Sequence, residues 1–491
     1  MGQVERIEIA PGFTISRVLT GLWQIADMEK DGTTLDPVKT APAMQPYFDA
    51  GLTTFDMADH YGSAEIITGT FQQSLPNPDD VQLFTKWVPK PGPVTRDEVR
   101  AAVQTSLDRM QAKSLDLLQF HCWNYGDPVW LDCLYWLQEM RDEGLIKNLG
   151  MTNIDTAHLR MALTSGIDIV TNQVCYSMLD QRASGAMTNM CEEFGVKLLA
   201  FGTLAGGFLT DKWFNKPEPD WDNLATMSQM KYGRYIRTAG GWDVYQNLLQ
   251  AMNNVAQKNN VSIANVACRY MLEQPAVGGV IIGARLGESE HIADNLKLFE
   301  FELGEDGQAE IQEALSQMTP IPGDCGDEYR KPPFLTATGD LSDHLETFPP
   351  PYTTQVWDDG SSRVLTGTIW EPIAGFSRAV QRGDRISISG TTATHNNQVV
   401  GGNDPASQTH FVIDKIEGAL QSLGSQLEDV VRTRIYIQNI DDWEPISRAH
   451  GERFGHILPA NTLVQAGIIG DEYLVEIEAD AIRSHASTEQ P

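Results

Sequence analysis

Four polar side chains stand at the ends of short apolar runs in the first part of the chain. Asp56 and Tyr61 lie in FDMADHYGSAE, Lys86 follows LFT, and His121 follows LLQF. A tyrosine hydroxyl can donate a proton, but its ordinary pKa near about 10 makes exchange at neutral pH one-sided. A cation beside the ring favours the phenolate and lowers that pKa, which is the role predicted for Lys86. Such a set could meet negative charge developing on a carbonyl oxygen.

Taken singly, each of these residues has an ordinary structural explanation, such as a helix cap, a cover over a core or a solvated charge. Their neighbours Asp59 and His60 look like rim residues. Glu65 is predicted in the first turn of the following helix, where a carboxylate suits the helix dipole.

The elements that must hold these residues alternate between strands and helices. Segments such as TRDEVRAAVQTSLDRMQ have helical periodicity and place their apolar positions on one face, namely Val99, Val103, Leu107 and Met110. Eight apolar runs predict strands between residues 18 and 299: VLTGLW, TTFDMA, VQLFTKW, LDLLQFHC, IKNLGMTN, IVTNQV, VKLLAFGTL and GGVIIGA. Eight strand–helix units predict an α/β fold, the (β/α)8 TIM barrel, whose working residues lie at the carboxyl ends of the strands.

A doubly wound sheet is the rival fold. Its G-x-G-x-x-G fingerprint should follow the first strand, and TGLWQIAD does not supply it. The barrel is therefore preferred.

At 491 residues the chain exceeds the roughly 250 to 300 residues of a single core. Residues 319–352 are rich in proline and predict a semi-extended linker or a surface wrap. New strand and helix patterns then follow, among them RISISGTTA, SQTHFVIDKIEGALQSLG, VVRTRIYIQNI and LVEIEADAI. We divide the chain into a barrel (1–318), a Pro-rich linker (319–362), a smaller α+β domain (363–483) and a C-terminal tail (484–491).

Composition restricts the classes of partner. The net charge of −30 would repel nucleic acid and anionic lipid over most of the surface. An apolar stretch long enough to span a membrane and a secretory leader are both lacking, so we expect a cytoplasmic protein that binds neither membrane nor nucleic acid. The six cysteines are scattered without metal-ligand spacing, which predicts buried reduced thiols and no metal site.

With DMADHYG matching D-x-A-x-x-Y-G, residues 9–318 resemble the aldo/keto reductase superfamily. The resemblance implies a NAD(P)-dependent oxidoreductase that reduces an aldehyde or ketone to an alcohol by hydride transfer, with Tyr61 as the proton donor. Asp56 would hold Lys86 by an ion pair, and His121 would orient the carbonyl. The family's catalytic tetrad maps onto Asp56, Tyr61, Lys86 and His121.

Later strand ends resemble the nicotinamide site of that family. Thr152, Asn153 and Gln173 would fix the carboxamide, and Phe201 would stack on the nicotinamide ring. A glycine-rich loop would let the backbone approach the pyrophosphate, through Gly202, Leu204, Gly206 and Gly207.

The last strand end resembles the adenine site. Arg285 could meet a 2′-phosphate, together with the N-terminus of a helix beginning near Ser289. Asp294 and Asn295 match family positions near the adenine. NADP is therefore the expected cofactor, and NAD stays open because His291 stands where relatives often have Arg or Gln.

Three tryptophans lie beside the predicted site in sequence, namely Trp23, Trp87 and Trp123. Large aromatic walls would favour a bulky or aromatic carbonyl compound. Alternatively, these rings simply plug the barrel mouth.

Most of residues 363–483 resembles the Rid family (YjgF-type proteins), which implies a chorismate-mutase-like α+β fold and a homotrimer with clefts between subunits. Members that hydrolyse imines carry an arginine after the Pro-Ala of the last segment, where this chain has Asn461. The neutral amide of Asn461 cannot replace the planar, charged guanidinium of an arginine, which binds a carboxylate through two hydrogen bonds. The candidate cleft residues are Arg434, Asn461 and Glu476, and the domain either handles a small molecule such as an imine or serves oligomerisation.

Other functions remain open at this level. The Rid-like domain could release a carbonyl from an imine that the barrel then reduces. The barrel could instead be a nucleotide-binding redox sensor or scaffold with little turnover, or an alcohol or sugar dehydrogenase that runs in the oxidative direction. The segment from Phe208 to Trp242 is expected to overhang the pocket and gives no indication of the substrate.

Overall fold

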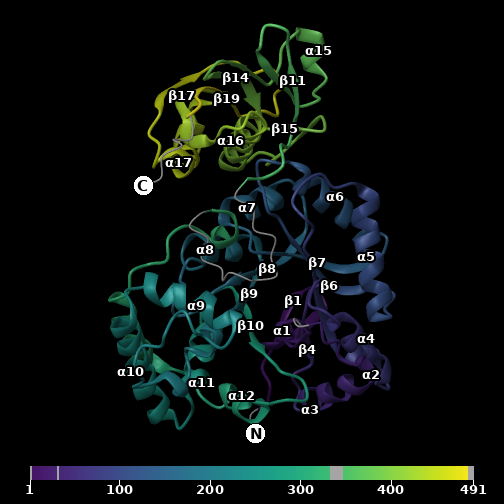
Figure 1. Cartoon of the computed structure of the whole chain (residues 1–491), viewed down its shortest axis with the longest axis vertical. Helices are drawn as coiled ribbons and strands as arrows, with labels where there is room; N and C mark the ends of the chain where they lie inside the picture. The colour runs from purple at the N-terminus through teal and green to yellow at the C-terminus, as the bar shows by residue number, and fades with distance from the viewer. Residues whose placement is uncertain (1–2, 30–31, 332–346, 485–491) are drawn as a thin grey trace.

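The N-terminal part of the chain closes into a barrel (Figure 1). The structure, a computed structural model, describes residues 3–29, 32–331 and 347–484. Eight strands follow one another in the order β10-β3-β4-β5-β6-β7-β8-β9, so the predicted barrel and all eight of its strands are confirmed. The strands are β3 (Val18–Gly21), β4 (Thr54–Asp56), β5 (Gln82–Trp87), β6 (Leu115–His121), β7 (Ile146–Thr152), β8 (Ile169–Cys175), β9 (Lys197–Phe201) and β10 (Val277–Gly283).

Helices surround the barrel, and α5 (Arg96–Met110) shows why they form. Thr95 and Glu98 make a capping box at its start, and the predicted apolar face is buried. The other barrel helices are α1 (Trp23–Glu29), α2 (Pro37–Thr40), α3 (Gln45–Asp49), α4 (Ala64–Ser74), α6 (Val129–Asp142), α7 (Thr156–Thr164), α8 (Ala186–Phe194), α9 (Met227–Thr238), α10 (Trp242–Asn259), α11 (Ile263–Leu272), α12 (Ile292–Asn295) and α13 (Gly304–Ser316). Each described helix is too short or too polar to cross a membrane.

A hairpin covers the amino end of the barrel. Its strands β1 (Arg6–Ala10) and β2 (Phe13–Ser16) pair antiparallel. Ile9 and Ile15 of this hairpin pack against inward-facing residues of the barrel strands, namely Leu19, Phe84, Leu117 and Leu199. Because apolar side chains fill this end, a ligand can enter only from the carboxyl ends of the strands.

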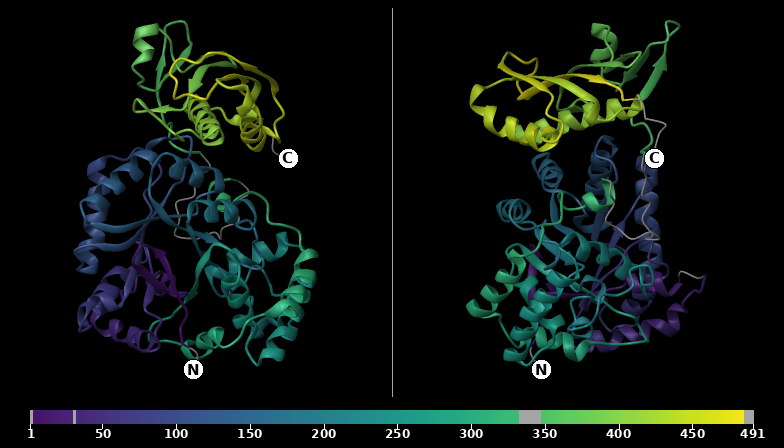
Figure 2. Two further views of the ribbon diagram at one scale, coloured as in Figure 1. Left: turned by 180° about the vertical axis from the view of Figure 1, so that it is seen from behind. Right: turned by 60° about the vertical axis from the view of Figure 1, so that its left-hand side comes forward.

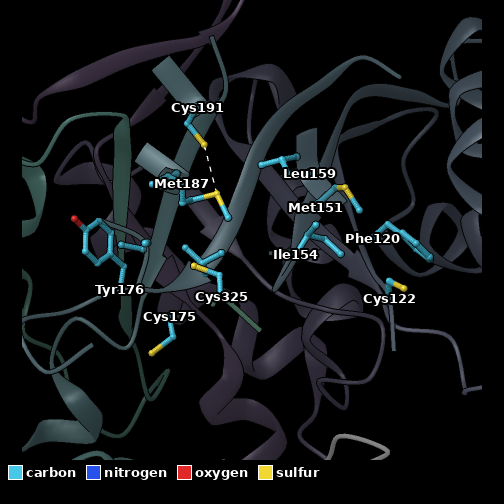
Figure 3. Close-up of a cluster of buried hydrophobic side chains, with 14 of the residues drawn as sticks. Phe120, Cys122, Met151, Ile154, Leu159, Cys175, Tyr176, Met187, Cys191 and Cys325 are labelled. Atoms are coloured by element: carbon cyan, nitrogen blue, oxygen red, sulfur yellow. Dashed lines mark hydrogen bonds between the residues drawn. The ribbon is translucent and has the colours of Figure 1, made fainter. Parts of the chain in front are cut away.

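The cysteines lie within apolar layers. Figure 3 shows Cys175, Cys191 and Cys325 in one such cluster, with the thiol of Cys191 directed at the sulfur of Met187. All six cysteines are free and buried, as predicted. Burial raises the pKa of Cys122 and Cys191 to about 12, so these thiols stay protonated at neutral pH.

The segment that follows α13 packs on the barrel instead of running over its surface. Ile321 and Cys325 are buried, and so is every residue of α14 (Asp327–Arg330). Arg330 explains this burial, because its Nε donates to the carbonyl oxygen of Cys122 (2.9 Å) and its Nη1 to that of Asn153 (2.6 Å). The predicted linker therefore has structure at its beginning; its residues 332–346 lie outside the described residues, as do 485–491 of the predicted tail.

The second domain is a sheet covered by helices on one face. Its strand order is β11-β12-β13-β14-β19-β17-β18, and it begins at Thr353, ahead of the boundary predicted at Arg363, because residues 353–365 form a hairpin on its edge. The strands are β11 (Thr353–Val356), β12 (Ser362–Leu365), β13 (Ala379–Arg382), β14 (Arg385–Thr392), β17 (Val430–Ile437), β18 (Ala460–Gln465) and β19 (Val475–Ile482), with the short pair β15 (Thr394–His395) and β16 (Gln398–Val399) beside them. The helices are α15 (Trp370–Ala374), α16 (Pro405–Ser422) and α17 (Trp443–Phe454), of which α16 lies between the sheet and the barrel (Figure 2).

Helix α16 docks against α7 and the loops at the carboxyl end of the barrel. His158 is the centre of this interface: its Nδ1 lies 2.7 Å from Asp155 and its Nε2 lies 3.0 Å from Asp414 of α16. Its ring stacks on Tyr125 with centroids 3.4 Å apart. Further polar pairs join the two domains: Arg160 with Asp404, Asn124 with Gln421, and His395 with Asp132.

The interface should weaken as the pH rises. Burial alone would lower the pKa of His158, but the carboxylates of Asp155 and Asp414 outweigh it and raise that pKa to about 9. A raised pKa stabilises the folded state fully below about 6.5, and this contribution is lost as the pH passes 9. We expect urea titrations followed by tryptophan fluorescence to show a free energy of unfolding that falls by up to about 3 kcal/mol between pH 6.5 and 9.5.

The variant His158→Gln should lose that slope. His395→Gln, which alters the other histidine that bridges the domains, should keep it. Equal slopes in the native chain and His158→Gln would contradict the assignment.

Candidate active site

A cavity of about 810 Å³ opens at the carboxyl end of the barrel strands. Its lining includes all four residues of the predicted tetrad and every predicted cofactor residue. Residues from seven different strand ends, those of β4 to β10, thus reach one space, because a closed parallel barrel brings those ends together.

The ion pair at the bottom of the cavity is buried. Lys86 Nζ lies 2.8 Å from Asp56 Oδ2 and 2.7 Å from the carbonyl oxygen of Met57, and both side chains are at most 5% exposed. The same ammonium lies 5.0 Å from the centre of the Tyr61 ring. Burial lowers the pKa of Lys86, while Asp56 acts in the opposite direction and supports its charge. The geometry places a buried cation beside the phenol, which is the arrangement that lowers a tyrosine pKa.

His121 lies on the neighbouring side of the cavity at the end of β6. Its Nδ1 is 3.4 Å from the carbonyl oxygen of Thr152, and its ring meets that of Trp123 edge-on at 4.3 Å. These contacts fix the plane of the imidazole, so that its position relative to Tyr61 is set by β6 and β7.

The predicted nicotinamide residues surround the ion pair. Gln173 Nε2 donates to Asp56 Oδ1 (2.7 Å), and Thr152 Oγ1 donates to the carbonyl oxygen of Gln173 (3.1 Å). Asn153 adopts a left-handed backbone with φ of 56°. Within the described part of the chain, its buried Oδ1 accepts no hydrogen bond. A buried acceptor at the cavity wall fits an amide N–H donor from a ligand.

The loop after β9 needs glycine. Gly206 and Gly207 have φ of 62° and 92°, values that a residue with a Cβ rarely adopts. A Cβ on Gly202 would collide with the hydroxyl of Tyr232. Phe201 lies just before this loop and is half-exposed to the cavity.

The far end of the cavity is lined by Arg285, His291, Asp294 and Asn295. Arg285 Nη1 lies 3.3 Å from Glu288, and Asp294 accepts from Ser262 Oγ (2.8 Å). The prediction that a helix begins near Ser289 is wrong, since α12 begins at Ile292 and has four residues. The reason is that Ser289 bridges back to Arg285 in an extended conformation. Arg285 is thus a group at this end of the cavity that can bind a phosphate.

The three tryptophans divide between the cavity and the core. Trp23 and Trp123 line the cavity, and Trp23 meets the Tyr61 ring edge-on at 5.1 Å. Trp87 instead packs on Phe120 (5.5 Å) in the apolar layer outside the strands. Neighbouring side chains of a strand point to opposite faces, so Lys86 and Trp87 cannot both face the cavity.

The neighbours of Tyr61 have the simpler roles expected of them. His60 lines the cavity edge with its Nδ1 2.8 Å from Asp59 Oδ1. Glu65 lies in the first turn of α4. It is also fully buried, where it accepts from Thr85 Oγ1 (2.7 Å) and pairs with Arg109 (3.1 Å).

The three candidate cleft residues of the second domain do not meet within one chain. Arg434 pairs with Glu478 (3.1 Å) and shares the open face of the sheet with Glu476. Asn461 donates to Thr433 Oγ1 (2.9 Å), on the side of the helices. Strand alternation causes this separation, because Asn461 is in register with Thr433 and not with Arg434.

Sequence reasoning missed three cationic or phenolic groups at these sites. Arg378 is buried in the second domain. Burial raises the pKa of Glu476, and the charge of Arg378 acts in the opposite direction. Lys231 of α9 and Tyr329 of α14 line the barrel cavity. Lys231 lies four residues from both Met227 and Tyr235 and so falls on the inward face of its helix, a spacing that could have revealed it.

Two protein families match the chain. The aldo/keto reductase family matches residues 17–316, and the family described as Endoribonuclease L-PSP matches residues 367–483. The second match identifies the C-terminal part as a Rid (YjgF-type) domain, and both predicted resemblances are confirmed.

Individual relatives cover one domain each. An uncharacterised protein from Streptomyces coelicolor is 38% identical over 122 residues, which are 25% of this chain and 91% of that protein. The protein tas of Escherichia coli is 29% identical over 46% of this chain and 69% of its own length. The glycerol dehydrogenase from Gluconobacter oxydans superposes with a TM-score of 0.52 at 21% identity, over 66% of this chain and 97% of that one, and so shows a shared fold.

Proposed function

We propose, from the premise that this chain belongs to the aldo/keto reductase family, that its barrel binds NADP and reduces an aldehyde or ketone to an alcohol. The barrel is an oxidoreductase of carbonyl or alcohol groups. The observation that carries the finer proposal is the buried contact chain from Asp56 through Lys86 to the ring of Tyr61, at the wall of one cavity with His121.

Each of the four residues has its own role in the reduction of the carbonyl. Tyr61 donates the proton to the oxygen as negative charge develops there, and Lys86 beside the ring makes that donation reversible near neutral pH. Asp56 keeps Lys86 charged against the cost of burial. His121 donates a hydrogen bond that orients the carbonyl. The same residues serve alcohol oxidation, so the geometry supports both directions.

The cavity also suits a dinucleotide. Asn153 Oδ1 offers a buried acceptor for a carboxamide, Phe201 offers a ring face, and the glycines of the loop after β9 admit a pyrophosphate. A bound nicotinamide cofactor supplies or accepts the hydride. Arg285 would pair with a 2′-phosphate, which favours NADP over NAD.

Cofactor oxidation by the full chain tests the proposal. With a panel of aromatic and aliphatic carbonyl compounds, we expect turnover with NADPH and a higher KM for NADH. Arg285→Ala should raise the KM for NADPH about 10-fold or more, because it removes a hydrogen bond to a charged group, and should leave NADH unchanged. Lys258→Ala, which alters an exposed cation outside the cavity lining, is the matched control. Binding of NADPH without turnover of any carbonyl would contradict the reductase.

For the Rid domain we propose a homotrimer built on the open face of its sheet. That face carries Arg434, Tyr436, Val464 and Glu478, a half-exposed mixture of charged and apolar groups. The barrel docks on the opposite, helical side, so assembly through the sheet would leave all barrel mouths accessible. Hydrolysis of an imine in a cleft between subunits would then depend on Glu476. The arginine that imine-hydrolysing members carry is replaced here by Asn461.

A further inference from the structure

Two polar side chains in the barrel cavity take no part in the chemistry proposed above. Lys231 of α9 is 7% exposed, and its Nζ donates a 2.7 Å hydrogen bond to the hydroxyl of Tyr329 in α14. Both line the same cavity as Tyr61. Tyr329 lies beyond residue 316, where the family match ends, whereas Lys231 lies within the matched region.

The pair lies close to the reacting groups. The Tyr329 ring is 5.7 Å from the ring of His121 and 4.7 Å from Lys231 Nζ, so it contacts both residues. Lys231 Nζ is also 5.1 Å from the centre of the Phe201 ring. His121 and Phe201 flank the expected position of the carbonyl, so the Lys231–Tyr329 pair lies beside that position.

The surroundings of Lys231 suit an anion. Three aromatic rings surround its ammonium, those of Phe201, Tyr232 and Tyr329. Arg182 pairs with Asp180 (2.6 Å) and Glu328 (2.8 Å), and Lys231 adds to the positive charge that lowers the pKa of Glu328. In such an apolar pocket a charge attracts an opposite charge more strongly than in water.

We propose that Lys231 and the Tyr329 hydroxyl form a subsite for a carboxylate of the substrate. The preferred substrate is then a carbonyl compound, or its alcohol, that also carries a carboxylate. Lys231 contributes the charge, and the phenol that accepts from it becomes a stronger donor to the same carboxylate. This inference rests on the proposed function, since it names the substrate class of that site.

A matched pair of substrates tests the subsite. 4-Carboxybenzaldehyde and the neutral 4-formylbenzamide have nearly the same shape and differ in charge. With NADPH and the native chain, we expect kcat/KM to be about 10-fold higher for the carboxylate, since charge-assisted hydrogen bonds exceed neutral ones. Lys231→Met should lower kcat/KM for the carboxylate about 10- to 100-fold, chiefly through KM, and leave the amide within about 3-fold.

Two further variants separate binding from structure. Lys231→Arg keeps the charge and should restore most of the preference, while Tyr329→Phe should reduce it about 10-fold. An equal fall for both substrates in Lys231→Met would show that the lysine only supports the pocket, and it would overturn the inference. A native chain that prefers the amide would overturn it as well.

A binding measurement keeps this test apart from that of the reductase itself. If the native chain turns over neither aldehyde, the proposed function fails, and calorimetry with 4-(hydroxymethyl)benzoate and 4-(hydroxymethyl)benzamide in the presence of NADP decides the subsite. Tighter binding of the benzoate that disappears in Lys231→Met supports it. Equal binding in the two proteins overturns it.

Discussion

Tyr61→Phe should lower kcat/KM for carbonyl reduction by about 100- to 10,000-fold, the range in which a positioned general acid contributes. The substitution removes one oxygen and keeps the ring that Trp23 and Lys86 contact. The cavity should therefore keep its shape, and NADPH binding measured by fluorescence should stay within about 2-fold, because Tyr61 is assigned to the carbonyl and not to the cofactor.

Tyr47→Phe is the control for this experiment. Tyr47 is a buried tyrosine of the barrel outside the cavity lining, and its variant should keep full activity. Retention of more than about a tenth of native kcat/KM by Tyr61→Phe would transfer the proton donation to another group, with His121 the first alternative.

Arg182→Met should destabilise the chain by about 3 to 5 kcal/mol, because removal of one partner leaves buried charges uncompensated. The Arg182 side chain is 2% exposed, binds Asp180 through two nitrogens (2.6 and 2.9 Å) and reaches Glu328 (2.8 Å) in α14. The pKa of Glu328 lies below its ordinary value, because Arg182, with a smaller effect from Lys231, outweighs the burial that would raise it. Without Arg182 this carboxylate can be protonated, so the loss should be smaller at pH 5 than at pH 8.

Urea titration of both proteins at the two pH values measures this loss. Arg96→Met removes an ion pair of similar length, with Glu139 at 2.6 Å, but both partners there are half-exposed. It should cost less than about 1 kcal/mol. Equal losses in the two variants would mean that Arg182 is no more important than a surface cation.

The tetrad could be located from sequence because its geometry follows from chain order alone. Asp56, Lys86 and His121 each end or nearly end a parallel strand, and closure of the barrel then brings them together. The face of the sheet on which Asn461 lies could not be predicted. It depends on the register of Asn461 with Thr433, which a single sequence leaves undefined. Trp87 could have been excluded from the cavity by its alternation with Lys86.

The burial of the segment after α13 could not be predicted, because its composition indicates only the local preferences of the backbone. Proline and glycine around it favour an extended chain. Its burial depends instead on distant partners: Glu328 needs Arg182, and Arg330 needs carbonyl groups that follow β6 and β7. Likewise, the subsite proposed for Lys231 depends on Tyr329, which is 98 residues away in sequence.

This segment also defines where the two domains can be separated. Residues 319–331 lie outside the family match, yet they supply Tyr329 to the cavity wall and Cys325 to the apolar layer of the barrel. Arg330 is stacked over Tyr125, the ring that also carries His158 of the domain interface. The part of the chain that the family matches is thus smaller than the unit that folds here. Recombination at the family boundary would yield a barrel with an incomplete pocket, whereas a break after Lys331 would preserve it.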